Sequence, residues 1–228
     1  MKRNKKDSYH HGDLRQALVA AGLTLLEQQG IEGLTLRRTA AAAGVSHAAP
    51  AHYFPTLKDL LTALAAIGFE RFGAAIAAEH VKAGPDPEAR MRAGGRGYVE
   101  FAAGNPGLFR LMFSSTLLNW DDEVLHNAAH ASFRQLEEIV RPMMGVAAEL
   151  GGPDELIKLV WCTTHGYAHL YLEGSMRWLE GKGDVGAPSV PRPPDIARLL
   201  ALRNRADGRK QGLGSSPRLG NRRVRRDS

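Results

Sequence analysis

One short stretch near the amino terminus, a pair of brief helical segments separated by a glycine, constrains the fold of this chain most. Thr35 can cap a helix over residues 36–43, Gly44 ends that helix, and Ser46 can cap a second helix that continues to about residue 54. Ala40 has the small side chain that two closely crossing helices need, and Gly44 can adopt the positive φ of a tight turn. The spacing predicts a helix-turn-helix, whose second helix can enter the major groove of DNA. An ordinary helical hairpin has the same spacing and stays open as the alternative.

The remaining sequence also predicts helices, so the expected fold class is all-α. Runs of β-branched residues with a period of two are absent, and Ala, Leu, Glu and Arg dominate segments with a helical period. Helices are expected at about 13–29, 56–79, 87–103, 106–114, 122–144, 153–173 and 195–205. Prolines and glycines predict a loop over 181–194, and the Gly, Ser and Arg content of 206–228 predicts a basic disordered tail.

Charge is distributed unevenly along the chain. The formal net charge is +6, but residues 1–6 carry +4, residues 7–191 carry −6 and residues 192–228 carry +8. The amino-terminal arm contains Lys2, Arg3, Lys5 and Lys6. Basic ends around an acidic middle predict a polyanionic partner that contacts the ends of the chain.

The sequence also predicts a cytoplasmic protein with no membrane partner. Cys162 is the single cysteine, which excludes an intramolecular disulfide and fits a reducing compartment. The chain does not open on a signal-peptide pattern. The longest strongly apolar stretch, Leu60–Phe69, has roughly half the length of a membrane span.

Three motifs in residues 9–72 resemble the TetR-type transcriptional regulators. They are Tyr9–Arg15 (YHHGDLR), Gly33–Arg37 followed by Ala43–Pro50, and Tyr53–Pro55 followed by Leu60-Leu61. A looser similarity follows downstream, where Asn105–Phe113 and Trp161 with His165-Gly166 are similar to a subgroup named for a Trp-His-Gly motif in its carboxy-terminal domain. The resemblance implies an amino-terminal helix-turn-helix domain over 1–55 and an all-helical effector-binding and dimerisation domain over 56–205.

The resemblance and the exposed start of the second short helix together give a set of candidate DNA-binding residues. His47 and His52 are expected to face the bases, and Arg37 and Lys58 to face phosphates. Ala51 and Leu57 stand where many family members carry a tyrosine and a lysine, which removes two backbone contacts. The full predicted set is Lys2, Arg3, Lys5, Lys6, Thr35, Arg37, Ser46, His47, Ala48, Ala49, His52, Tyr53 and Lys58.

The second domain is predicted to bind a small apolar or aromatic effector. Candidate effector-binding residues are Tyr98, Phe101, Phe109, Met112, Phe113, Phe133, Trp161 and His165. Taken one at a time, each aromatic side chain favours the alternative, a plain core position. The helix over 56–79 is expected to pack on the first helix through its leucines and to turn Phe69, Phe72 and Ile76 toward the proposed cavity.

A homodimer is expected because one helix-turn-helix contacts only a few base pairs, so tight binding to operator DNA requires two. The predicted interface is a stripe on the helix over 153–173, paired with its twin and with a final helix in a four-helix bundle. Its residues are Leu156, Val160, Thr163, Tyr167 and Leu170. The alternative is that this stripe packs within its own subunit.

Neither catalysis nor a metal or other cofactor is predicted. Two histidine pairs at i, i+4 spacing, His126 with His130 and His165 with His169, lack the acidic residue of an H-E-x-x-H site. No phosphate-binding loop, nucleophile elbow or dinucleotide-binding pattern occurs. Two functions remain, a ligand-responsive repressor of transcription and a helical interaction module whose basic ends bind nucleic acid non-specifically. Dependence on one DNA sequence distinguishes them.

Overall fold

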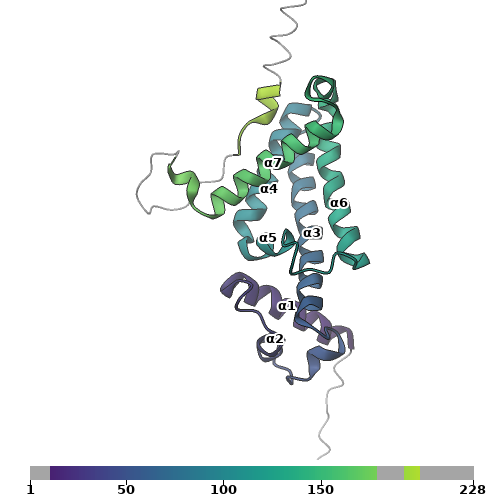
Figure 1. Ribbon diagram of the computed structural model, residues 1–228, viewed down its shortest axis with the longest axis vertical. Helices are drawn as coiled ribbons and strands as arrows, with labels where there is room; N and C mark the ends of the chain where they lie inside the picture. The colour runs from purple at the N-terminus through teal and green to yellow at the C-terminus, as the bar shows by residue number, and fades with distance from the viewer. Residues whose placement is uncertain (1–10, 179–192, 201–228) are drawn as a thin grey trace, which may run out of the picture.

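The computed structural model describes residues 11–178 and 193–200, and these residues form an all-helical protein (Figure 1). The α-helices are α1 (His11–Gln29), α2 (Leu36–Ala42), α3 (Leu57–Lys82), α4 (Pro87–Gly104), α5 (Pro106–Met112), α6 (Glu123–Val140) and α7 (Pro153–Leu172). Three 3-10 helices, η1 (Ala49–His52), η2 (Arg141–Leu150) and η3 (Ser175–Trp178), lie between or after them. The predicted all-α class is confirmed.

Some expectations fall on residues that the structure does not describe. These are the arm residues Lys2, Arg3, Lys5 and Lys6, most of the loop predicted over 181–194, and the tail over 206–228. The helix predicted over 195–205 is helical at 196–200, where the described residues end.

Polar caps fix where the helices begin. The Thr35 hydroxyl accepts a hydrogen bond from the Arg38 N–H at 3.1 Å, which starts α2 at the predicted residue. Thr56 and Asp59 form a capping box at the start of α3, with the Asp59 carboxylate accepting from the Thr56 N–H at 2.8 Å. Three further helices, α4, α5 and α7, begin with a proline, whose missing N–H costs least at that position.

The helix predicted to begin at Ser46 is wrong. Residues 47 and 48 form a turn, and only the four residues of η1 are helical, with 3-10 rather than α geometry. Pro50 explains the difference, because it has no N–H to donate to the Ser46 carbonyl and its ring would clash with that carbonyl in an α-helix. The Ala49 N–H instead donates to the Ser46 carbonyl at 3.0 Å, which closes a tighter turn.

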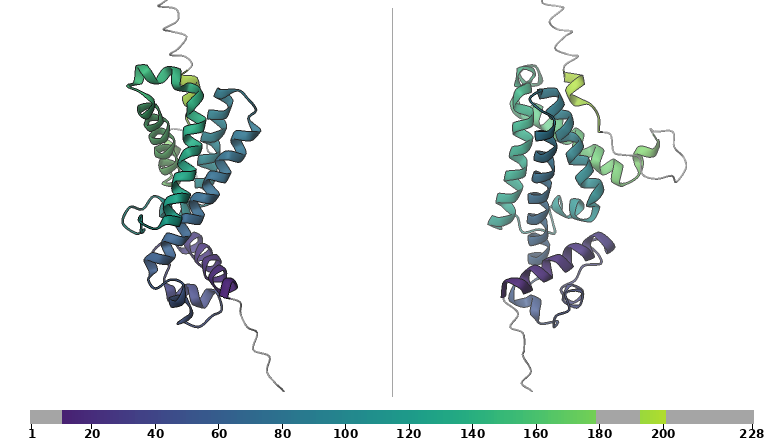
Figure 2. Two further views of the ribbon diagram at one scale, coloured as in Figure 1. Left: turned by 90° about the vertical axis from the view of Figure 1, so that its right-hand side faces the viewer. Right: turned by 180° about the vertical axis from the view of Figure 1, so that it is seen from behind.

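The helices form a small unit at one end of the molecule and a larger bundle at the other (Figures 1 and 2). The small unit contains α1, α2 and η1, and its helix α1 packs against the first turns of α3. α3 then runs into the bundle, where it packs on α4, α5 and α6, and α7 packs across α4 and α6. Buried apolar side chains form one cluster that extends from Leu18 and Leu26 in α1 to Val140 and Leu156 in the bundle. α3 is therefore the shared core helix of both parts.

α3 is also the one helix among the described residues that is long and apolar enough to span a membrane. This differs from the estimate based on Leu60–Phe69, because the apolar residues continue along the helix beyond Phe69. The apolar window is 61% buried against the other helices, as is typical of the core helix of a soluble protein.

Candidate DNA-binding unit and ligand cavity

The turn between α2 and η1 has the geometry that a helix-turn-helix needs. Gly44 adopts a φ of +70°, which a residue with a Cβ rarely adopts. The Val45 N–H donates to the Ala40 carbonyl at 3.0 Å, and Ala40 itself is fully buried. The small residue and the glycine thus occupy the crossing and the turn that the sequence predicted.

The side chains predicted to contact DNA lie mostly at the surface of this unit. Thr35, Arg37, Ser46, His47, Ala48, His52 and Lys58 are exposed, whereas Ala49 and Tyr53 are half-buried. Pro50 and Phe54 are buried and hold η1 against the core of the unit. The surface therefore offers two histidines near the turn and two cations at the starts of α2 and α3.

Two arginines near this surface already have partners within the unit. The Arg38 guanidinium donates a hydrogen bond to the Gln29 side-chain carbonyl at the end of α1. Arg15 lies over the ring of Phe54, with 5.6 Å between its guanidinium carbon and the ring centroid. Sequence reasoning missed both contacts, because each joins residues that are far apart in the chain.

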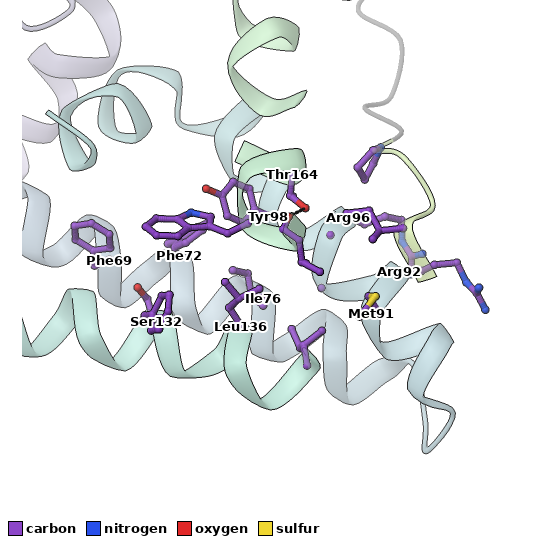
Figure 3. A pocket seen from close by; sticks show the side chains of 18 of the residues that line it. Phe69, Phe72, Ile76, Met91, Arg92, Arg96, Tyr98, Ser132, Leu136 and Thr164 are labelled. Carbon is purple, nitrogen blue, oxygen red and sulfur yellow. Dashed lines mark hydrogen bonds between the residues drawn. The ribbon is translucent and has the colours of Figure 1, made fainter. Parts of the chain in front are cut away.

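A cavity of about 610 Å³ lies among α3, α4, α6, α7 and the segment 193–197 (Figure 3). Four of the eight predicted effector-binding residues line it: Tyr98, Phe113, Phe133 and Trp161. Phe69, Phe72 and Ile76 of α3 also line it, as their positions in the sequence suggested. Its size falls within the range of small-molecule sites in proteins.

The other four predicted effector-binding residues do not line the cavity. Phe101, Phe109 and Met112 are core residues, and Phe109 and Met112 are fully buried. Met112 fills the space above Gly68, where an added Cβ would lie 2.7 Å from the Met112 sulfur. The close approach of α5 to α3 leaves no room for a ligand there. His165 lies behind the cavity wall, with its ring centroid 4.5 Å from that of Phe113.

Tyr98 and His165 satisfy each other's polar atoms behind the cavity wall. The Tyr98 hydroxyl lies 2.6 Å from His165 Nδ1. Burial raises the pKa of Tyr98, an effect that a hydrogen bond from Trp161 partly offsets. Burial, together with the neighbouring His169, lowers the pKa of His165 to about 4. His165 is therefore neutral at pH 7, so only one of its two ring nitrogens carries a proton.

Both histidine pairs singled out in the sequence adjoin in space. The ring centroids of His165 and His169 are 4.5 Å apart, and those of His126 and His130 are 6.3 Å apart. Within residues 11–178 and 193–200, no group of three His, Cys, Asp or Glu side chains is arranged to hold a metal ion.

Three of the five residues in the stripe predicted to form the dimer interface face the interior of the chain. Leu156, Val160 and Tyr167 are buried against the chain's own helices and offer no surface to a partner. Thr163 is half-buried, and Leu170 is 50% exposed. A second leucine of α7, Leu159, is also exposed, at 42%. Leu156, Val160 and Tyr167 thus pack within their own subunit, which is the alternative that the sequence left open.

A carboxylate from α1 caps the first turn of α5. Glu27 accepts hydrogen bonds from the Gly107 N–H at 3.1 Å and from the Leu108 N–H at 2.9 Å. Gly107 makes this approach possible, since a Cβ there would lie 2.6 Å from the Leu26 carbonyl oxygen. We call this contact the Glu27 joint. It links the helix-turn-helix unit directly to the bundle, and its sequence separation hides it from local pattern analysis.

Comparison with known proteins places both parts of the chain. Residues 18–64 match the family described as "Bacterial regulatory proteins, tetR family", and residues 91–187 match "Tetracyclin repressor-like, C-terminal domain". Among curated proteins, none matches the chain. The description of the matched carboxy-terminal family does not mention a Trp-His-Gly motif, so assignment to that subgroup stays a prediction.

Solved structures resemble most of the chain. A protein of unknown function from Rhodococcus sp. RHA1 is 31% identical, with a TM-score of 0.64 over 90% of this chain and 98% of that one. A putative TetR family transcription regulator from Shewanella sp. PV-4 is 22% identical, with a TM-score of 0.56 over 74% of this chain and 90% of that one. The TetR family transcriptional regulator PfmR from Thermus thermophilus is 20% identical, with a TM-score of 0.50 over 82% and 96%. At these identities, the last two show the shared fold alone.

The two family matches occur in order along one all-helical chain that begins with a helix-turn-helix. The family is one of transcription regulators and not of enzymes. On this combination of sequence and structure, the chain belongs to the TetR family of DNA-binding transcriptional regulators.

Proposed function

We propose that the protein is a cytoplasmic homodimeric repressor that a small molecule releases from a palindromic operator. The observation that carries this proposal is the double role of α3. Leu60 and Leu64 pack against Gly22 of α1, whereas Phe72 and Ile76 of the same helix line the cavity. A ligand that displaces α3 therefore acts on the DNA-binding unit through a single rigid element.

Simultaneous docking makes such a displacement effective. Two helix-turn-helix units must sit about 34 Å apart to enter successive major grooves on one face of DNA. A shift of a few ångströms in their separation removes the gain from binding both half-sites at once. An effector that prefers the displaced arrangement by roughly 1–3 kcal/mol lowers operator affinity about 5- to 150-fold.

The exposed residues of the helix-turn-helix unit supply the proposed DNA contacts. We assign base contacts to His47 and His52, and phosphate contacts to Arg37 and Lys58, all of which are exposed. Because η1 is a short 3-10 turn with Ala51 at its surface, it offers few side chains for backbone contacts. The basic arm, Arg37 and Lys58 are expected to provide most of the electrostatic affinity.

For the dimer, we propose the exposed side of α7 together with the helical turn at 196–200. Leu159, Leu170 and Leu199 are 42%, 50% and 63% exposed, so their side chains are available to a partner. Leu170→Glu should shift the protein to monomer in size-exclusion chromatography with light scattering. Val124→Glu is the matched control, because Val124 is likewise exposed, at 61%, but belongs to a different helix, α6. Equal dimers from both variants would exclude the proposed interface.

Selection of bound sequences from random DNA tests the DNA-binding part of the proposal. A single palindromic sequence should emerge, and the protein should bind it at least about 10³-fold more tightly than unrelated DNA. The second candidate, a module that binds nucleic acid without sequence preference, predicts no enrichment. Binding that depends on salt alone would therefore refute sequence-specific regulation.

Reciprocity tests the release mechanism. If an effector weakens operator binding by a given factor, operator DNA must weaken effector binding by the same factor. Titration of the effector against free and against operator-bound protein measures the effector affinity of each form. Equal affinities in the two titrations would show that the cavity and the DNA-binding unit are not coupled.

A further inference from the structure

The cavity is long and narrow. Its lining residues on α6 extend from His126 through Ala129, Phe133 and Leu136 to Ile139, a span of about 20 Å along the helix. A volume of about 610 Å³ over that length corresponds to a mean cross-section of about 30 Å². A single extended chain fits such a space better than a compact ring system does.

Three hydroxyl groups in the wall of the cavity are already hydrogen-bonded within the protein. The Ser132 hydroxyl donates to the Ala129 carbonyl at 2.8 Å, and the Thr164 hydroxyl donates to the Val160 carbonyl at 2.8 Å. The Tyr98 hydroxyl is engaged with His165. A ligand body beside these hydroxyls gains free energy by burying apolar surface, and a polar group placed there would lose its hydration without compensation.

One end of the cavity carries two arginines. Figure 3 shows Arg92 and Arg96 with Met91 at one end of the group and Phe69 at the other. Three carboxylates surround Arg92, with N–O distances of 3.9 Å to Asp86, 3.4 Å to Glu88 and 3.7 Å to Asp195. The charge of Arg92 is therefore largely compensated.

Arg96 differs from Arg92 in having no such compensation. Within the described part of the chain, no carboxylate lies within 4 Å of its guanidinium, although the cation is close enough to Glu79 to help lower the pKa of that carboxyl. Arg96 thus adds an available positive charge to one end of a cavity whose lining is mostly apolar. A guanidinium in this setting favours a carboxylate or another small anionic group.

We infer that the ligand of this cavity is an elongated aliphatic molecule that ends in one anionic group, with a long-chain carboxylate as the simplest example. The apolar chain lies between α3 and α6, and the anionic head meets Arg96 beside the segment 193–197. This inference rests on the proposed role of the cavity as the effector site, but it concerns ligand chemistry and is tested without DNA.

The test compares three probes that share one chain length, namely dodecanoate, dodecan-1-ol and dodecyltrimethylammonium. Binding below the micelle concentration is followed by the fluorescence of Trp120 and Trp161, which line the cavity. Dodecanoate should bind about tenfold more tightly than the alcohol, and the ammonium should bind most weakly. Across shorter carboxylates, each lost methylene should weaken binding about fourfold.

Two variants locate the anionic head. Arg96→Gln should remove the preference for dodecanoate over the alcohol, and Arg96→Lys should restore part of it. Arg71→Gln is the matched control, because Arg71 is an exposed cation on α3 that does not line the cavity. Equal affinity for the three probes, failure of all three to bind, or unchanged discrimination in Arg96→Gln would overturn the inference. Loss of discrimination in His126→Gln instead would place the head at the opposite end and also overturn it.

The same measurements separate this inference from the proposed function. Protein that binds dodecanoate through Arg96 but retains its operator in the presence of dodecanoate would keep the ligand assignment and refute the effector role. Operator release by an uncharged or cationic molecule, combined with no discrimination among the probes, would do the reverse.

Discussion

The Glu27 joint yields the prediction with the clearest structural basis. Glu27→Ala removes the acceptor of two backbone N–H groups in the first turn of α5, at 3.1 and 2.9 Å. A hydrogen bond to a charged group contributes about 1.5–3 kcal/mol when buried. Because Glu27 is exposed, water replaces part of each bond, and we expect a total loss of about 1–2 kcal/mol in the free energy of unfolding. For a chain of this size, that corresponds to a fall in Tm of about 3–6 °C.

Urea unfolding followed by circular dichroism measures this loss, at one protein concentration because oligomer formation shifts apparent stability. Glu70→Ala is the control, since Glu70 is an exposed glutamate of α3 outside the joint. Glu27→Gln should lose less than the alanine variant, because the amide oxygen still accepts one hydrogen bond. The usual uncertainty of such comparisons is about 0.3 kcal/mol. If the free energies of unfolding of Glu27→Ala and its control differ by less than that, the joint does not stabilise the protein and our reasoning about it is wrong.

Three further predictions concern packing, protonation and DNA binding. Gly97→Ala should destabilise the protein by about 1–3 kcal/mol, because the new Cβ would lie 3.1 Å from the Ala75 carbonyl oxygen on α3, and a backbone atom cannot move aside as a side chain can. An unchanged urea concentration at the unfolding midpoint would contradict this. His165 should make the protein less stable as the pH falls from about 6.5 toward 4, because its side chain takes up a proton in the unfolded chain but, with a pKa of about 4, not in the folded one. After allowance for partial solvent screening, the loss in the free energy of unfolding is about 1–2 kcal/mol. If the stability of His165→Phe depends on pH with the same slope, His165 is not the cause. Lys58→Ala should weaken binding to all DNA sequences and reduce by about one the slope of log affinity against log salt concentration, whereas His47→Ala should relax base preference. Fluorescence anisotropy measures both effects, and their reversal would show that the unit docks in another orientation.

The elements with local signals could be predicted from the sequence. Thr35 and Thr56 mark the starts of α2 and α3 because a capping side chain satisfies N–H groups only three residues away. Gly44 was predictable for the same reason, as a turn with positive φ needs no distant partner. The helix expected from Ser46 failed where two local signals disagreed. Ser46 favours a helix cap, but Pro50 forbids the hydrogen bond that an α-helix would make there.

Contacts between distant segments could not be predicted in this way. A helical period identifies an apolar stripe on α7, but it does not say whether the chain itself or a second copy covers that stripe, and Leu156 and Val160 prove to be covered by the chain. Four of the eight predicted effector-binding residues line the cavity and four do not, because aromatic character marks both a core and a ligand site. The arginines at the end of the cavity gave no local signal, since their role depends on the packing of α4 beside residues 193–197.

The shared hydrophobic cluster along α3 has a consequence for how this protein can be divided. Leu60, Leu61 and Leu64 complete the core beneath α1, so a fragment that ends at residue 55 lacks the inner wall of its own core. We expect the helix-turn-helix unit to be stable only with at least the first half of α3 attached, and the two parts to unfold in one cooperative transition. Exchange of DNA-binding units between relatives would therefore have to cut inside a buried helix, where the leucines of both parents must match. A binding specificity transplanted at the apparent boundary would inherit a mismatched core.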